Sequence, residues 1–413
     1  MTIIIERGMV DRRTPLILVA GWRGSIEQTA HALLKPGTII VRHDLADVYE
    51  GIVRRTLTTI DDEREEILEL AHGCVSCTLR EDLLPLLRRL HDRSNVDRIV
   101  LLLDPLFEPE ALCWAIEHMV VTGIIGRVDA PASHDVRVEG TVTCVDAATW
   151  LDDATGYDEL DDERTLAQVV VGQVEFADAL VVHPGSDGWQ QARLHAVLSR
   201  LAPDAPVIWG EHGDIESLLR RIPPTARRGA ISDAHTPLLR GQPPLDEDCG
   251  VQLFEYTARR PFHPERLHGA IDALLDGVVR TRGRAWVATQ PDNALLLESA
   301  GGGLRIAHAG PWLASMTPEQ LRDVNSERQA LAALRWDETF GDRDTSLAIL
   351  THDTEPDSIR AALDRAQLTD AELAKPHLWA SWSDPFGDYH EDPCEPSALS
   401  EPETSSTEGE GRR

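Results

Sequence analysis

Short apolar runs that alternate with helical patterns constrain the fold of the first half of this 413-residue chain. Such runs lie at residues 15–20, 38–41, 98–103, 140–145, 179–182 and 206–209. Each is almost continuously apolar, which is typical of strands that are buried on both faces of a parallel sheet. The stretches between them carry the 3.6-residue periodicity of helices. The pattern therefore predicts an α/β domain, a mostly parallel sheet with helices on both faces.

The second half of the chain has a different pattern. Residues 223–248 are rich in Pro, Gly, Arg and Asp without periodicity, which predicts a linker. Residues 249–388 mix alternating strand patterns with a few helices and predict a smaller α+β domain. Residues 389–413 are acidic and nearly free of apolar side chains, so we expect a disordered tail. The predicted order is an N-terminal extension (1–13), the α/β domain (14–222), the linker, the second domain and the tail.

The formal net charge of −30 limits the classes of partner. Nucleic-acid phosphates would repel such a surface, so we expect no direct DNA binding, and instead a basic protein partner or a metal cation. No apolar run approaches the roughly 20 residues of a membrane helix, and the first residues lack a signal-peptide pattern. The six cysteines are scattered apart from one pair, which fits a reducing compartment. We therefore expect a cytoplasmic protein without membrane contact.

The paired cysteines are the main chemical feature of the first domain. Cys74 and Cys77 stand three residues apart, at a predicted turn from strand to helix. Thiols at this spacing can bind one soft metal ion or form a redox pair, and they can also be two small buried residues in a turn. A single Cys-x-x-Cys does not separate these alternatives. Nearby candidates for further ligands are His72, and His43 with Asp44 after the second predicted strand.

Five motifs follow one another along the chain: Gly73-Cys-Val-Ser-Cys-Thr-Leu-Arg80, Val142-Thr-Cys-Val-Asp-Ala147, Gln173-Val-Glu-Phe-Ala-Asp178, Arg260-Pro-Phe-His263 and Phe340-Gly-Asp-Arg343. Their order resembles that of the CobW family of bacterial GTPases and metal chaperones. The resemblance implies a P-loop-like first domain, a CobW C-terminal domain, and zinc as the metal.

In the family a third cysteine stands at the position of Ser76, and a carboxylate near the position of His43 approaches the metal. The resemblance therefore predicts the zinc ligands Cys74, Cys77 and His43, with His72 or Asp44 as a fourth.

The departures from the family fall on its nucleotide chemistry. A phosphate loop needs a lysine for the β- and γ-phosphates, and Glu27 stands at that position. Because a carboxylate repels triphosphate, we expect neither GTP binding nor hydrolysis, and we assign no catalytic residue. Gly21, Arg23 and Gly24 are a weak remnant of the loop that could hold an anion.

Two further nucleotide motifs are also altered. The guanine-reading Asn-Lys-x-Asp is replaced by His183-Pro-Gly-Ser186, where Asp187 could supply the carboxylate only in a shifted register. The Glu-x-x-Gly that ends a family strand is replaced by Leu102-Leu-Asp-Pro105. Three separate losses therefore argue against GTP hydrolysis.

A degenerate phosphate loop beside this cysteine motif most resembles the actinobacterial branch of the family that recruits a ribosome hibernation factor. That resemblance implies a zinc-responsive protein that brings the hibernation factor to the ribosome under zinc limitation. Two other functions stay open. A GTP-dependent zinc metallochaperone would bind GTP, and a redox protein would use Cys74 and Cys77 as a dithiol.

Overall fold

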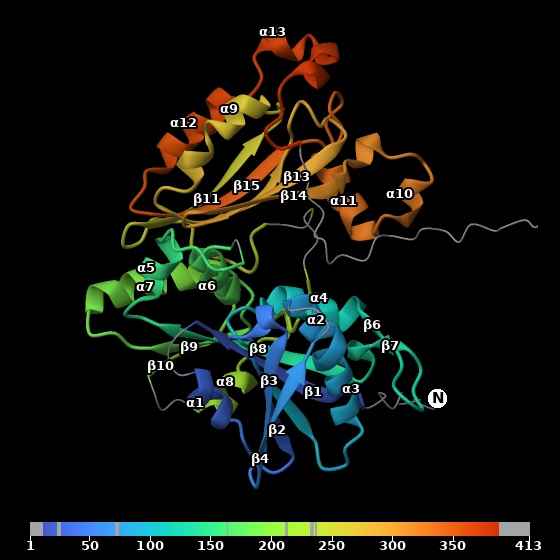
Figure 1. The fold of residues 1–413 in the computed structure, drawn as a ribbon. Helices are drawn as coiled ribbons and strands as arrows, with labels where there is room; N and C mark the ends of the chain where they lie inside the picture. The colour runs from blue at the N-terminus through green and yellow to red at the C-terminus, as the bar shows by residue number, and fades with distance from the viewer. Residues whose placement is uncertain are drawn as a thin grey trace, which may run out of the picture.

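The chain folds into two domains, one above the other in Figure 1. The computed structural model describes residues 11–22, 26–70, 74–162, 164–210, 214–231, 235 and 238–387. The N-terminal domain is built on an eight-stranded sheet in the order β10-β9-β8-β1-β5-β2-β3-β4. The C-terminal domain is built on a five-stranded sheet in the order β11-β15-β12-β13-β14. The predicted mostly parallel sheet with a separate second domain is confirmed.

The six predicted strands form the parallel part of the first sheet. Their alternate side chains enter two cores: Leu16 and Leu18 face one, and Ile17 and Val19 face the other. Helices α3 and α4 cover the first face, and α1 and α8 cover the second. Burial on both faces is the reason that these strands read as continuous apolar runs. The bounds are β1 Thr14–Gly21, α1 Ile26–His31, β2 Thr38–Asp44, α3 Leu84–His91, β5 Arg98–Leu102, α4 Pro109–His118, β8 Val136–Asp146, β9 Ala179–His183, β10 Val207–Trp209 and α8 Ile215–Arg220.

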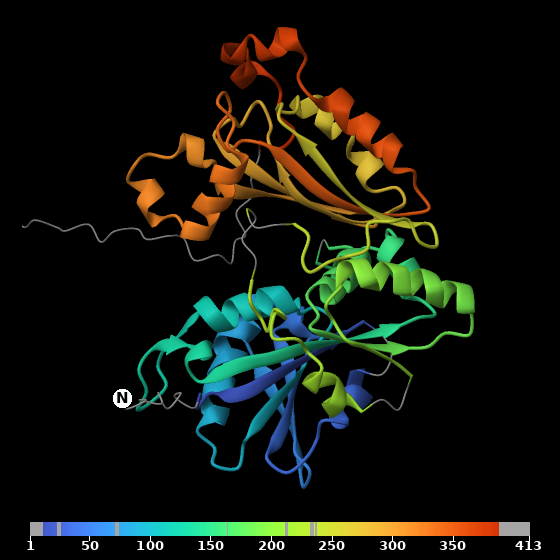
Figure 2. The same cartoon turned by 180° about the vertical axis from the view of Figure 1, so that it is seen from behind.

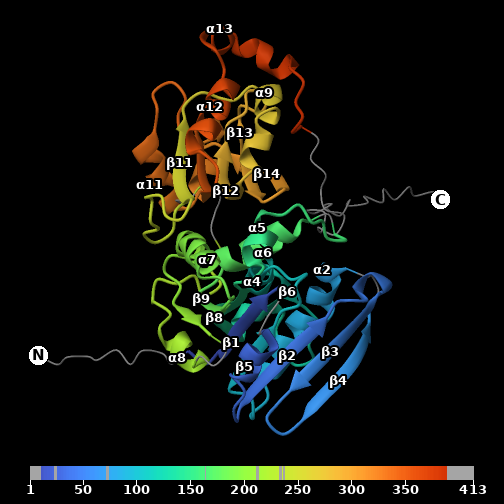
Figure 3. The same cartoon turned by 90° about the vertical axis from the view of Figure 1, so that its left-hand side faces the viewer.

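A hairpin that the apolar pattern did not predict extends this sheet at one edge. Strands β3 (Ile52–Thr58) and β4 (Glu63–Glu69) pair antiparallel beyond β2 and stand at the side of the domain in Figure 3. The side chains of β4 are nearly all exposed, and five of its seven residues are Glu or Arg. Main-chain pairing rather than an apolar face therefore holds β4, so its sequence shows no strand pattern.

Three helices lie between the two sheets: α5 (Trp150–Thr155), α6 (Leu166–Glu175) and α7 (Gly188–Leu201). Helix α6 begins with a capping box, in which Thr165 and Gln168 each bond the other's backbone N–H. Apolar side chains of these helices share one core with the C-terminal sheet, among them Val170 and Leu194 against Leu253. The two domains are therefore joined by a packed apolar interface.

The C-terminal sheet is antiparallel and has helices on its outer face. Helices α9 and α12 pack there, on Phe254 and Ile349. Helices α10 and α11 project beside β14 (Figure 1). The bounds are β11 Val251–Ala258, α9 Pro264–His268, β12 Val278–Ala285, β13 Asn293–Ala300, β14 Gly303–Pro311, α10 Gln320–Asp323, α11 Ser326–Arg335, β15 Thr345–His352, α12 Pro356–Ala366 and α13 Asp370–Leu373.

The connection between the domains carries no helix or strand at any described position from 223 to 248. It appears as a yellow-green coil segment between the two domains in Figure 2. The predicted tail at 389–413 lies outside the described residues. No helix in the described part of the chain is long and apolar enough to cross a bilayer.

Candidate metal centre

Cys74 and Cys77 lie at the start of a helix that runs from α2 (Val75–Thr78) through a π-helical turn (Leu79–Leu83) into α3. The Cys77 backbone N–H donates to Cys74 Sγ at 3.3 Å. The two sulfur atoms are 3.1 Å apart. The spacing of three residues therefore places both thiols on one side of the first helical turn.

The distance between the sulfur atoms lies between a disulfide bond and the separation of two thiolates on one zinc ion. A disulfide has an S–S length of about 2.05 Å, so Cys74 and Cys77 are not joined. Two thiolates on one tetrahedral zinc ion, each about 2.3 Å from the metal, lie about 3.8 Å apart. A small rotation of either side chain covers the difference from 3.1 Å. The two thiols thus fit one half of a tetrahedral zinc site.

His43 lies on the same face of the sheet as the helix that follows the cysteines. It shares that face with Val41, and Leu79 enters the same core. Its Nε2 is 2.8 Å from Asp82 Oδ2, and its Nδ1 is buried with no hydrogen-bond partner among the described residues. Asp82 also bonds the buried Arg55. Burial acts to raise the pKa of Asp82, but His43 and Arg55 lower it overall.

The predicted ligand set is therefore only partly in place. Among the residues that the structure describes, no group of three or more His, Cys, Asp or Glu side chains is arranged to hold a metal ion. Nε2 of His43 is engaged by Asp82, and Asp44 accepts the backbone N–H of Ala46 at 3.0 Å. His72 lies outside the described residues. Zinc ligation by Cys74, Cys77 and His43 stays a prediction.

The region of the former phosphate loop holds an ion pair. Gly21 ends β1 with φ +154°, and a Cβ added there would lie 2.8 Å from the Cys144 carbonyl oxygen. Glu27, in the first turn of α1, places Oε1 2.6 Å from Nη1 of Arg42 on β2. Arg23 and Gly24 lie outside the described residues. Glu27, which we expect at the position of the family's lysine, is thus held by an arginine from the strand that follows α1 in the chain.

The other altered nucleotide motifs have structural roles here. Asp104 follows β5 and accepts the backbone N–H groups of Leu45 and Leu106 at 3.1 and 3.0 Å. Burial raises its pKa. Asp187 caps α7 by accepting the backbone N–H of Trp189 at 2.8 Å. Both carboxylates are therefore engaged in joining or ending elements of the fold.

Comparison with known proteins agrees with this architecture. Residues 46–208 match the model of the CobW/HypB/UreG nucleotide-binding domain, and residues 251–367 match the CobW C-terminal domain. A protein of Mycobacterium tuberculosis that is named a zinc chaperone is 49% identical over 408 residues, which cover 97% of this chain and 100% of the relative. The chain belongs to the CobW family. Its match to the nucleotide-binding domain begins at residue 46, after Gly21 and Glu27.

A more distant relative is also named for zinc. The zinc-regulated GTPase metalloprotein activator 1 of Dictyostelium discoideum is 27% identical over 356 residues, which cover 81% of this chain and 73% of that protein. Among solved structures, the Zn(II)-bound YjiA GTPase of E. coli is 16% identical with a TM-score of 0.37, covering 86% of this chain and 99% of that one.

Two residues of this region, Asp82 and Arg42, were not predicted from the sequence. The alternation of side chains along β2 could have indicated that Arg42 and His43 lie on opposite faces of the sheet. On β2, Val41 and His43 share the α3 face, whereas Ile40 and Arg42 share the α1 face. That period of two separates His43, beneath the cysteine helix, from Arg42, beside the phosphate-loop remnant.

Proposed function

We propose that this chain handles zinc through Cys74 and Cys77, as a zinc-responsive CobW protein that does not hydrolyse GTP. The observation that carries the proposal is the pair of thiols 3.1 Å apart at the start of one helix. A relative that is 49% identical over nearly the whole chain is named a zinc chaperone, which supports zinc as the metal. Because thiolates bind zinc and thiols do not, occupancy would depend on free zinc and on pH.

The Glu27–Arg42 pair supports the loss of GTP hydrolysis. Triphosphate binding at this loop requires a cation at position 27, and the structure has a carboxylate there. The side chains of Glu27 and Arg42 are 64% and 44% exposed, so the pair itself adds little stability. Its consequence is electrostatic, because Glu27 places a negative charge where the binding of a phosphate needs a positive one.

We further propose that the zinc response serves to recruit a ribosome hibernation factor to ribosomes when zinc is limiting. The resemblance of the degenerate loop and cysteine motif to that branch of the family supports this role. The net charge of −30 favours basic proteins over bare RNA as the contact. The partner on this model is the basic hibernation factor or a basic ribosomal protein.

Zinc content tests the metal part of the proposal. Purified protein is analysed by inductively coupled plasma spectrometry beside the Cys74→Ser/Cys77→Ser variant and a matched Cys249→Ser control. The double variant is expected to lose the bound zinc, and the control, whose cysteine lies far along the chain in the second domain, to keep it. Equal zinc content in the double variant and the wild type would refute the site.

A pull-down from zinc-starved and zinc-replete cells tests the partner. Ribosomal proteins together with a hibernation factor are expected to copurify in a zinc-dependent manner. Their absence in both states, while zinc still binds, would refute the recruitment role and leave the metal site standing.

A GTP-dependent zinc metallochaperone is the second candidate. It is favoured by the match to the nucleotide-binding domain and by the Dictyostelium relative, which is named a GTPase. Titration with a fluorescent GTP analogue separates the two functions, with Glu27→Lys as the companion variant. Micromolar binding by the wild type would favour the chaperone. Binding that appears only in Glu27→Lys would favour the recruitment factor.

A further inference from the structure

A cavity between the two domains is lined by arginines from three parts of the chain. One belongs to α7, two to the connecting segment, and two to β12. In the described lining they face one carboxylate, that of Glu175 at the end of α6. The arginines are Arg200, Arg227, Arg240, Arg280 and Arg282. In a protein whose net charge is −30, this concentration of cations requires a physical explanation.

The carboxylate is already paired with the two arginines of β12. Glu175 Oε2 lies 2.8 Å from Arg280 Nη2, and its Oε1 lies 3.5 Å from Arg282 Nη1. Glu298 on β13 pairs with the same two arginines at 3.1 and 3.0 Å. Glu110 on α4 lies 3.6 Å from Arg282 as well. Three acidic groups thus pair directly with Arg280 and Arg282, whereas Arg200 and Arg227 on the opposite wall form no ion pair within 4 Å with the described residues.

Arg200 is one of those remaining cations. It is 6% exposed, and its guanidinium donates to the backbone carbonyls of Ala196 and Asp246 at 2.7 and 2.5 Å. Its Nε is buried and has no partner in the described part of the chain. Burial lowers its pKa, although the charges of Asp248, Glu247 and Asp246 act in the opposite direction. None of these carboxylates forms an ion pair with it within 4 Å, so its hydrogen bonds reach only neutral carbonyls, which favours an anion beside it.

Arg227 is the second such cation. Its guanidinium lies 5.2 Å from the centre of the Phe176 ring, and its Nη1 is buried without a hydrogen-bond partner among the described residues. Burial, and then the charge of Arg240, lower its pKa to about 10. The described residues form no ion pair with it at 4 Å or less. Arg227 therefore presents unused N–H donors to the cavity.

The space beside these arginines suits a small oxyanion. The arginine-walled chamber has a volume of about 50 Å³, and one water molecule needs roughly 10–15 Å³ on the same measure. It adjoins a wider cavity of about 520 Å³, which shares Glu175, Arg227 and Arg240 with it. That volume is in the range of small-molecule sites, so an anionic group could enter with the rest of a metabolite attached.

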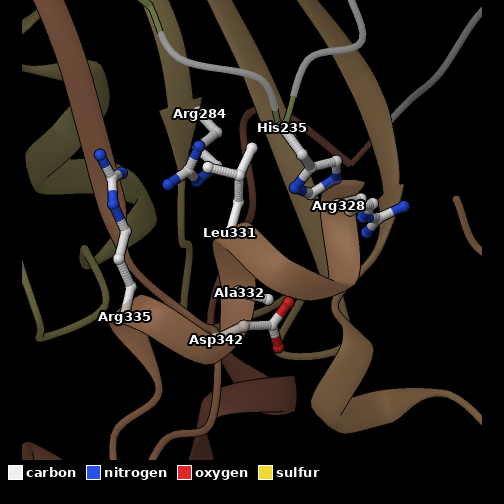
Figure 4. A pocket seen from close by; sticks show the side chains of 7 residues that line it. All are labelled: His235, Arg284, Arg328, Leu331, Ala332, Arg335 and Asp342. Carbon is white, nitrogen blue, oxygen red and sulfur yellow. The ribbon is translucent and has the colours of Figure 1, made fainter. Parts of the chain in front are cut away.

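A second arginine-lined pocket, in the C-terminal domain, shows the contrast (Figure 4). Arg284, Arg328 and Arg335 line it together with His235. Here Asp344 bonds Arg284 through both oxygens, at 2.8 and 3.2 Å, and lies 3.9 Å from Arg335. The protein itself thus supplies a carboxylate to Arg284 and Arg335, whereas Arg200 and Arg227 form no ion pair within 4 Å with the described residues.

We propose that the cavity between the domains binds a phosphoryl oxyanion, with Arg200 and Arg227 as its donors. The planar fork of a guanidinium matches phosphate oxygens and gives two parallel N–H···O bonds. The ligand is inorganic phosphate or the phosphate group of a small metabolite. Because the donors come from α7 and from the connecting segment, and β12 forms the facing wall, a bound anion joins the two domains. The site is separate from the phosphate-loop remnant at Gly21.

Calorimetric titration of the full-length, zinc-free protein tests the proposal. Inorganic phosphate and glycerol 3-phosphate are titrated separately at constant ionic strength in chloride buffer. Saturable one-to-one binding is expected, and Arg200→Gln or Arg227→Gln is expected to weaken it about tenfold or more. Arg64→Gln, on the exposed β4, and Arg42→Gln, beside the phosphate-loop remnant, are expected to bind as the wild type does.

The remaining outcomes identify the ligand or overturn the site. Tighter binding of glycerol 3-phosphate indicates a metabolite, and equal or weaker binding indicates free phosphate. Absence of saturable binding up to about 20 mM overturns the proposal. So does unchanged binding in both Arg200→Gln and Arg227→Gln, or a loss in Arg42→Gln. Arg227→Lys, which keeps the charge, is expected to bind with intermediate affinity and shows whether the glutamine variant failed only through misfolding.

Discussion

The ion pairs of Glu175 across the domain interface allow the contribution of one side chain to be worked out. Its carboxylate, at the end of α6, contacts Arg280 and Arg282 of β12 at 2.8 and 3.5 Å. Burial acts to raise its pKa, but the charges of Arg280, Arg282 and Arg227 lower it from the ordinary 4.5 to about 2. The side chain is 16% exposed, so solvent screens these contacts only weakly.

The lowered pKa sets the size of the expected effect. A difference of about 2.5 pH units, at about 1.36 kcal/mol per unit, corresponds to about 3 kcal/mol of stabilisation at neutral pH. Removing one partner of a buried pair costs a similar amount, about 3–5 kcal/mol. We therefore expect Glu175→Gln to destabilise the folded protein by about 3 kcal/mol, with the loss centred on the interface between the domains.

The pH dependence has a definite sign. Because the folded pKa of Glu175 lies below the unfolded one, its stabilisation is complete above about pH 4.5. It is lost as the pH falls toward about 2. The wild type should lose this contribution over that range, whereas Glu175→Gln should not.

Hydrogen exchange of α6 and β12, together with urea unfolding, measures the effect. Glu298→Gln is the matched control, because Glu298 pairs with the same two arginines from β13 of the same sheet. We expect Glu175→Gln to raise exchange on both sides of the interface and the control to raise it mainly within the C-terminal sheet. The reasoning is refuted if the two variants show the same exchange pattern, or if Glu175→Gln changes stability by less than about 0.5 kcal/mol.

Three further substitutions test the packing of the first domain by urea unfolding. Gly21→Ala should cost about 1–3 kcal/mol, because φ is +154° and the new Cβ would meet the Cys144 carbonyl oxygen at 2.8 Å. Leu87→Ala should cost about 2–5 kcal/mol, because Leu87 is fully buried in the core under α3. Asp82→Asn should cost about 2–4 kcal/mol, because the buried Arg55 loses its buried carboxylate partner and keeps only the exposed Glu66.

The control for these three is Leu334→Ala on α11, where the leucine is 84% exposed. It should change the free energy of unfolding by less than about 0.5 kcal/mol. A loss of stability in Leu334→Ala as large as that in Leu87→Ala would contradict the assignment of the core. An unchanged free energy of unfolding in Gly21→Ala would show that the end of β1 can relax away from β8.

The strands that could be predicted are those buried on both faces, because such strands are continuously apolar in sequence. The runs around Leu16 and Val142 form strands whose two faces are both buried against apolar cores, so apolar residues occur at successive positions. Strand β4 has no such apolar run, since six of its seven residues are exposed and its main chain pairs with β3. The projection of α10 and α11 was missed for the same reason, because none of the residues in these helices is buried.

By itself, the sequence determined the local chemistry of this protein. The three-residue spacing places Cys74 and Cys77 on one helical turn. The negative charge at position 27 follows from the residue type, Glu, without any knowledge of the fold. Only the tertiary structure decided which distant groups these residues meet. His43 turns its Nε2 to Asp82, 39 residues away, and Glu27 meets Arg42 on the other face of the sheet. Periodicity reports which face a side chain occupies, whereas its partner there depends on long-range packing.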